Sequence, residues 1–341
     1  MTAASGDLLR LRDLTIALRG PNGPAIGRDI NFAVRRGERV GLVGESGSGK
    51  TMTVLSIMRL QPPAVVLRSG RIEFADRDLI AASEAEMAHI RGARIAMVYQ
   101  NPLSSLNPVR TVGWQISEAI RAHESVSKPV LRRRVIDLLG EVGIKNAEQR
   151  IDDYPHQFSG GMRQRVVIAT AISCAPELLL ADEPTTALDV TTQARILDLL
   201  DRLVDERGMA VVFVTHDLAV ANAFCDRIDV MYAGRVVESG PAAALTHTPV
   251  HPYSEALVQA QCTFELDPDL PMPAIGGQPP VVGQVPAGCA FHPRCRLARD
   301  ECSVAAPVPV QLGDRLVECH VRAPKHDADR VAGEPSGTAV S

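Results

Sequence analysis

The 341-residue chain has no excess of positive charge. Its 36 lysines and arginines are outnumbered by 40 aspartates and glutamates, so the formal net charge is −4. Proteins that bind nucleic acid usually present a strongly basic surface. We therefore expect no nucleic-acid partner.

Long apolar runs are missing as well. No stretch approaches the ~18 to 20 apolar residues that a membrane-spanning helix needs. The first residues carry Asp7, Arg10 and Arg12 where a signal peptide would have an apolar segment. We therefore expect neither a membrane span nor an export signal.

Cysteine is too sparse and too scattered for a secreted disulfide framework. Three of the seven cysteines, Cys174, Cys225 and Cys262, stand far apart, as buried thiols usually do. The apolar fraction of 45% is sufficient for a globular core. One large domain with an appendage is the simplest expectation for this length.

Residues Gly44–Thr51 spell Gly-Glu-Ser-Gly-Ser-Gly-Lys-Thr, the pattern of a P-loop. An apolar run at 40–43 predicts a strand before it, and 52–60 predicts a helix after it. Glycines let backbone N–H groups converge on phosphates, a lysine reaches the β- and γ-phosphates, and a threonine hydroxyl meets Mg²⁺. A chance glycine-rich turn is the alternative, and eight matching positions argue against it. The residues expected to bind nucleotide here are Gly44, Ser46, Gly47, Ser48, Gly49, Lys50, Thr51 and Thr53.

The rest of the pattern predicts an α/β fold with a mixed sheet. Alternation at 9–18 and a strand at 30–34 indicate an antiparallel hairpin ahead of the P-loop, and strands follow at 71–74 and 95–99. Helical spacing from 111 to about 150 indicates a helical subdomain inserted at about 101–165.

Polar residues follow several predicted core strands. The apolar run 178–181 ends in Asp182 and Glu183, the run 211–214 is followed by His216, and 95–99 is followed by Gln100. The carboxyl ends of parallel strands meet at one edge of a sheet, where such folds place their chemistry. These side chains are therefore expected beside the P-loop.

A second loop precedes a predicted helix at 166–173. Residues 158–165 read Phe-Ser-Gly-Gly-Met-Arg-Gln-Arg, and serine with glycine at a helix start can cap the helix or bind an anion. Taken alone, a plain helix cap is the better explanation.

Together these motifs resemble the ATP-binding subunit of ABC transporters over residues 8–245. The resemblance implies that Asp182 helps to hold Mg²⁺, that Glu183 polarises the attacking water and that His216 contacts the γ-phosphate. Gln100 would link metal and water to the transporter interface. It also implies that the signature of one subunit covers ATP on a partner's P-loop. The signature and D-loop residues are Ser159, Gly160, Gly161 and Asp189.

The signature and the segment 100–108 resemble the dipeptide and oligopeptide importer branch, and 251–257 with the tail extends the match to about residue 322. That branch implies a second, related ABC ATPase subunit, two transmembrane permeases, and indirectly an extracytoplasmic solute-binding protein. The chain would lie at the cytoplasmic face of the cell membrane. Leu18 stands where an aromatic residue commonly stacks on adenine, which weakens that contact.

The four remaining cysteines, Cys289, Cys295, Cys302 and Cys319, cluster in the tail. Four thiolates in a loop-rich segment can hold zinc or an iron–sulfur cluster, and the wide spacings favour the cluster. The resemblance implies a [4Fe–4S] cluster in a small metal-binding extension, with zinc as the runner-up. The segment has few large apolar residues, so a metal would also help to order it.

The expected domains are 1–245 for the ATP-binding domain, 246–324 for the extension and 325–341 for a disordered tail. The expected function is ATP hydrolysis coupled to uptake of di- or oligopeptides. Nickel-chelate or glutathione import remains an alternative. A soluble ABC ATPase acting on nucleic acid or ribosomes is a more distant one, because no long coiled coil separates P-loop and signature and only one P-loop is present.

Overall fold

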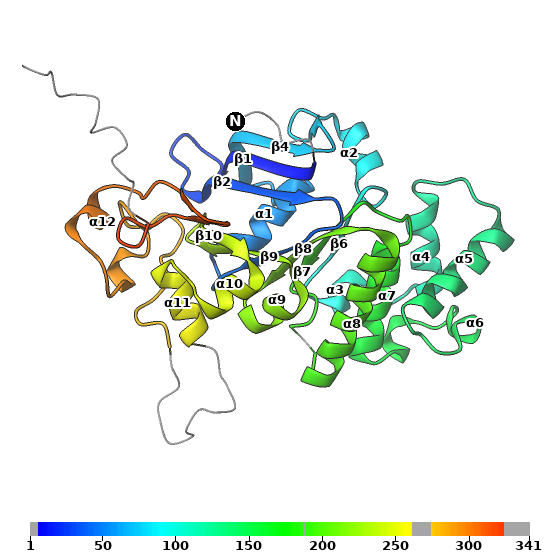
Figure 1. Cartoon of the computed structure of the whole chain (residues 1–341). Coiled ribbons are helices and arrows are strands. Elements are labelled where there is room, and N and C mark those ends of the chain that lie inside the picture. Colours follow the sequence, from blue (N-terminus) through cyan, green and yellow to red (C-terminus); the bar gives the residue numbers. More distant parts are fainter. Residues whose placement is uncertain (1–5, 187, 261–273, 324–341) are drawn as a thin grey trace, which may run out of the picture.

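The computed structural model describes residues 6–186, 188–260 and 274–323, and the predicted tail at 325–341 lies outside them. Two sheets and the helices around them form the molecule (Figure 1). Of the helices in the described ranges, none combines the length and the apolar character that crossing a bilayer demands.

The main sheet is mixed, as expected, and has the strand order β11-β12-β10-β9-β3-β8-β7-β6. Strands from β9 to β6 in this order run parallel, and strand β7 is buried along its whole length. Such apolar runs suit a parallel sheet covered on both faces. The strands are β3 (Arg39–Val43), β6 (Ile95–Val98), β7 (Leu178–Asp182), β8 (Ala210–Thr215), β9 (Arg227–Tyr232), β10 (Arg235–Pro241), β11 (Val310–Leu312) and β12 (Arg315–Val317).

A four-stranded antiparallel sheet lies above one face of the main sheet, with helix α1 (Lys50–Ile57) between them (Figure 1). Apolar side chains from both sheets and from α1 form one continuous core. The predicted hairpin is thus part of a complete antiparallel subdomain. Its strand order is β2 (Ala25–Arg35), β1 (Asp7–Leu18), β4 (Val65–Phe74) and β5 (Arg77–Asp78).

Helices form a second core on the opposite face. The region predicted as helical contains α4 (Val112–Arg121), α5 (Lys128–Glu141) and α6 (Ala147–Arg150), which lie together at one end of the molecule (Figure 1). Helix α7 (Gly160–Ala171) begins six residues before the predicted start, because Ser159 caps it. The other helices are α2 (Glu84–Ile90), α3 (Pro102–Ser105), α8 (Val190–Arg207), α9 (Leu218–Phe224), α10 (Ala242–His247), α11 (Pro252–Gln259) and α12 (Asp300–Val304).

The C-terminal extension is attached to the main sheet by backbone pairing. Strand β12 pairs antiparallel with β10, with Glu238 opposite Val317, and β11 pairs with β12. Arg235 of β10 donates two hydrogen bonds to the carboxylate of Glu318, at 3.0 and 3.2 Å. Sheet pairing and this ion pair therefore hold residues 310–318 against the main sheet.

Candidate functional site

The P-loop connects the buried end of β3 to the start of α1. Gly44 lies so close to the backbone of β9 that an added Cβ would be 2.1 Å from the carbonyl oxygen of Met231. Gly49, the N-cap of α1, has φ +104°, which favours glycine. These two positions hold the loop in a tight curve with its N–H groups at the helix N-terminus, as phosphate binding requires.

Lys50 lies over this curve. Its ammonium donates to the carbonyl oxygens of Gly44 at 2.7 Å and Glu45 at 3.0 Å. Burial lowers the pKa of Lys50, against the opposing effect of the nearby carboxylates Glu183, Asp182 and Glu45. A cation that is desolvated in this way favours an anion beside it.

Two threonines, Thr51 and Thr53, follow Lys50 in the sequence, and their side chains point in different directions. The Thr51 hydroxyl donates to Asp182 Oδ1 at 3.2 Å, so it faces the end of β7. Thr53 is fully buried, and its hydroxyl donates at 3.0 Å to the carbonyl oxygen of Gly49 within α1. Thr51 thus lies beside Asp182, whereas the side chain of Thr53, which was also expected to bind nucleotide, points into the core.

The acidic pair has two distinct environments. Asp182 is 4% exposed, and burial raises its pKa, with the bond from Thr51 acting the other way. For Glu183, burial also disfavours the carboxylate, but hydrogen bonds from Thr186 and His216 outweigh it, so its pKa lies below the ordinary value. Glu183 is therefore ionised near neutral pH.

Three side chains hold the Glu183 carboxylate. Gln100 Nε2 donates to Oε2 at 2.8 Å and the Thr186 hydroxyl donates to the same oxygen at 2.9 Å. His216 Nδ1 is 3.3 Å from Oε1. The structure thus brings together Gln100, Glu183 and His216, which the sequence placed at three strand ends. Thr186 was not predicted, and no motif weighed in the sequence pointed to it.

The signature residues form an exposed helix start. Ser159 Oγ accepts a hydrogen bond from the Met162 N–H at 3.4 Å, and Gly160 begins α7. Within the described ranges, no side-chain hydrogen bond joins Ser159 to the P-loop. Asp189 similarly caps α8, accepting bonds from the Thr192 N–H and hydroxyl at 2.9 and 2.8 Å.

The four tail cysteines line one small cavity of about 10 Å³ together with Phe291 and three histidines. The predicted [4Fe–4S] cluster, and the zinc alternative, are nevertheless wrong: over the part of the chain that the structure describes, no group of three or more His, Cys, Asp or Glu could hold a metal ion. Burial raises the pKa of the Cys289 thiol to about 11. The cysteine pattern carried no information about this burial.

A further set of contacts reaches the P-loop from the C-terminal extension. The Glu45 N–H donates to the Tyr253 hydroxyl at 2.8 Å, and the Glu45 carboxylate accepts from Arg294 at 2.7 and 3.0 Å. Sequence reasoning missed both partners. Their separation from the loop, 208 and 249 positions, leaves no local signal in a single sequence.

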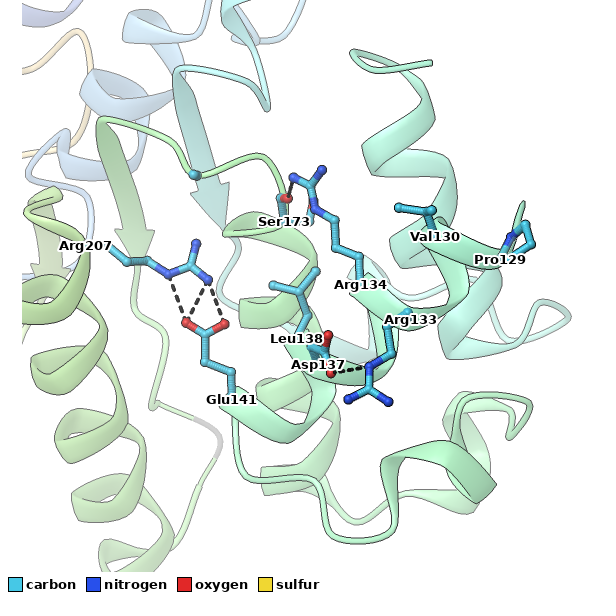
Figure 2. Close-up of a pocket in the computed structure, with 10 residues that line it drawn as sticks. Pro129, Val130, Arg133, Arg134, Asp137, Leu138, Glu141, Ser173 and Arg207 are labelled. Atoms are coloured by element: carbon cyan, nitrogen blue, oxygen red, sulfur yellow. Dashed lines mark hydrogen bonds and ion pairs between the residues drawn. The ribbon is translucent and has the colours of Figure 1, made fainter. Parts of the chain in front are cut away.

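A cavity of about 620 Å³ lies elsewhere, between α5 and the ends of α7 and α8 (Figure 2). Its charged residues are paired with one another or with the backbone: Arg207 with Glu141, Arg133 with Asp137, and Arg134 with the carbonyl oxygen of Ser173. It offers no unpaired charge for an anionic substrate, and it contains none of the strand-end residues.

Two families match the chain. Residues 28–186 match the family described as ABC transporter, and residues 237–302 match the oligopeptide/dipeptide transporter C-terminal region. The dipeptide transport ATP-binding protein DppD of Escherichia coli (strain K12) is 46% identical over 326 residues, which cover 95% of this chain and 98% of that protein.

Solved structures of ATP-binding cassettes have the same fold. The dimeric cassette MJ0796 in a post-hydrolysis state, bound to ADP and Pi, is 30% identical with a TM-score of 0.61, over 69% of this chain and 98% of that one. The protein cbiO1 of Clostridium perfringens, part of the transporter complex cbiONQ, is 27% identical with a TM-score of 0.63, over 72% and 93% of the two chains.

Proposed function

The chain belongs to the ABC transporter family of ATP-binding proteins, in the group with an oligopeptide/dipeptide transporter C-terminal region, and we propose that it hydrolyses ATP to drive uptake of di- or oligopeptides. The observation that carries the proposal is the Glu183 carboxylate held by Gln100, Thr186 and His216 beside a P-loop. Its likeness to a dipeptide transport protein over 95% of its length supports the peptide assignment.

The residues present fit ATP with Mg²⁺. The loop N–H groups and the desolvated ammonium of Lys50 are set to receive the phosphates, with Ser46, Gly47 and Ser48 in the same curve. Thr51 and Asp182 offer hard oxygen ligands to Mg²⁺, and Gln100 adds a third candidate. The metal would neutralise charge that develops on the transferring phosphoryl group.

Glu183 is the group proposed to orient the attacking water. It is ionised and its two oxygens have different partners. Oε2 accepts two bonds, from Gln100 and Thr186, while among the described residues Oε1 has only the 3.3 Å contact with His216. Oε1 is therefore the oxygen more available to accept a proton from water. His216 then completes the site at the γ-phosphate, with half of its side chain exposed.

A second ABC ATPase subunit is proposed to complete each site. The exposed helix start at Ser159, Gly160 and Gly161 presents free N–H groups and a positive helix end, which suits a phosphate held by a partner. The solved MJ0796 cassette is dimeric. We propose a related but distinct partner subunit here, with Asp189 near the shared boundary.

Two transmembrane permeases are proposed to dock beside Gln100. A cavity of about 380 Å³ lies between the Tyr99–Leu106 segment, α4 and α7. Leu103 and Trp114, 63% and 41% exposed, add apolar surface nearby. A permease segment seated there would contact the same segment that positions Gln100 against Glu183. The chain would then lie at the cytoplasmic face of the membrane, with a solute-binding protein on the other side.

We also propose the domain division 1–245 and 246–324, with the helical subdomain at about 101–165. The packing of α4, α5 and α6 in one core supports the helical subdomain. The match to the oligopeptide/dipeptide transporter C-terminal region, which starts at residue 237, supports a separate C-terminal part.

The test reconstitutes the chain with its permeases and partner subunit in vesicles. We expect ATP hydrolysis to rise, and labelled dipeptide to accumulate, when binding protein and dipeptide are added. Nickel chelate and glutathione serve as competing solutes. Transport of either one without transport of any peptide would contradict the peptide assignment, and absence of ATP hydrolysis would contradict the ATPase assignment.

A further inference from the structure

The C-terminal extension holds Glu45, the second residue of the P-loop, at two points. The Glu45 backbone N–H donates to the hydroxyl of Tyr253 in α11 at 2.8 Å. The Glu45 carboxylate accepts from both terminal nitrogens of Arg294, at 2.7 and 3.0 Å. The paired geometry is the strong, directional form of an arginine–carboxylate interaction. The extension is therefore in direct contact with the loop proposed to bind phosphate.

Arg294 has no spare donor in this arrangement. Besides Glu45, it donates to the carbonyl oxygens of Gly276 at 2.8 Å and Ile275 at 3.3 Å, and to the Tyr232 hydroxyl at 3.3 Å. These five contacts match the five N–H donors of a guanidinium. Arg294 is only 4% exposed at its side chain. Because the Arg294 guanidinium is buried and uses all its donors, it has little freedom to move, and it can hold the Glu45 carboxylate in one position.

Aromatic packing holds both contacts in position. The rings of Tyr232 and Tyr253 are 4.5 Å apart, and Phe291 packs edge-on against Tyr232 at 5.3 Å. The Arg294 guanidinium lies 5.8 Å from the Tyr232 and Phe291 rings. Tyr253 is fully buried. Strand β9, helix α11 and the segment around Arg294 thus form one packed unit behind the loop.

The charge of Glu45 gives these contacts a consequence for nucleotide binding. An unpaired carboxylate in a phosphate-binding loop would repel a triphosphate, and Arg294 compensates that charge. The Glu45 carbonyl also accepts from Lys50 at 3.0 Å, so a shift of Glu45 would move the phosphate-binding lysine. We propose that Arg294 and Tyr253 are positioning residues through which the C-terminal extension sets the affinity of the P-loop for MgATP. This inference rests on the proposed ATPase function.

The experiment compares full-length parent, Arg294→Gln, Tyr253→Phe and Arg296→Gln. Arg296 is the matched control, because it lies two residues after Arg294 and is exposed. In the part of the chain that the structure describes, its side-chain hydrogen bond is to Gln259 of the extension, at 3.2 Å. Calorimetry gives the Kd for MgATP, circular dichroism gives the melting temperature, and the assembled transporter gives KM and kcat.

Arg294→Gln should raise the Kd and KM for MgATP roughly tenfold or more, with a smaller effect on kcat, because a charged hydrogen-bonded pair is lost. Tyr253→Phe keeps the ring and should raise Kd about fivefold. The control should stay within about twofold of the parent. In a protein that already carries Glu45→Gln, adding Arg294→Gln should raise the Kd for MgATP much less, because the carboxylate charge that Arg294 compensates is gone.

A merely structural role would lower the melting temperature and leave the Kd unchanged. A folded Arg294→Gln protein with the parental Kd would therefore overturn the inference. If Arg294→Gln does not fold, a folded Tyr253→Phe protein with the parental Kd would overturn the inference instead. A parent that binds no MgATP would instead refute the proposed function itself.

Discussion

Replacing Glu183 by glutamine separates nucleotide binding from hydrolysis. The substitution keeps the side-chain size and leaves Lys50 and the loop glycines untouched, so the Kd for MgATP should change little. Oε2 of Glu183 accepts two bonds, from Gln100 at 2.8 Å and Thr186 at 2.9 Å, and Oε1 faces His216 at 3.3 Å. A glutamine oxygen can keep the two shorter bonds. Its amide then occupies the Oε1 position, where the proposed water would need an acceptor.

The expected loss is at least about a hundredfold in kcat, which corresponds to about 2.7 kcal/mol in the activation free energy. ATPase turnover in the assembled transporter measures kcat, and calorimetry with MgATP measures binding. Thr186→Ala is the matched comparison, because it removes one bond to the carboxylate and keeps its charge, and we expect it to retain more activity. Parental turnover in Glu183→Gln would refute the assignment of Glu183 as the water-orienting group.

Three further predictions concern binding, pH and assembly. Lys50→Ala should weaken MgATP binding roughly ten- to a hundredfold, since a charged phosphate contact is lost; calorimetry with an unchanged Kd would contradict it. His251 is buried, its Nδ1 accepts from the Tyr253 N–H, and burial lowers its pKa from 6.5 to about 3. The unfolded chain therefore binds a proton that the folded chain does not, and stability falls by up to about 1.4 kcal/mol per pH unit as pH drops below 6.5. His251→Asn, which keeps an acceptor, should lose about 2 kcal/mol less than the parent between pH 7 and 5 in urea titrations; equal losses would contradict this. The isolated chain should hydrolyse ATP weakly and gain activity with its partner subunit. A chain that sediments as a monomer and shows full ATPase activity would contradict the shared site.

Local pattern was sufficient to bring the residues of the proposed nucleotide site together. The P-loop depends on consecutive residues, and Glu183, His216 and Gln100 follow strands whose apolar runs are visible in the sequence. Parallel pairing of those strands then places their ends together without further information. The antiparallel and helical subdomains were predictable for the same reason, although the start of α7 at Gly160 depended on the Ser159 cap.

Long-range contacts and burial were not predictable in this way. Strands β11 and β12 have three residues each, too few for a periodicity, so the extension seemed to need a metal. The spacing of the four cysteines says nothing about the protonation of Cys289 or the small cavity that they line. Arg294 and Glu45 are 249 positions apart, and only the folded chain shows that they meet.

That separation has a consequence for synthesis of the protein. Strand β3 lies between β8 and β9, so the P-loop strand has no partner in the main sheet until residues 210–232 have been made. The contact from Arg294 comes later still. At the usual ~5 to 20 residues per second of translation, a span of 249 residues takes on the order of 12 to 50 s. The apolar strand waits for its sheet partners until β9 has been made, and the loop waits for its contact with Arg294 over the whole interval. The nucleotide-binding loop is thus among the early segments to be synthesised, and its contact with Arg294 is among the late contacts to become available.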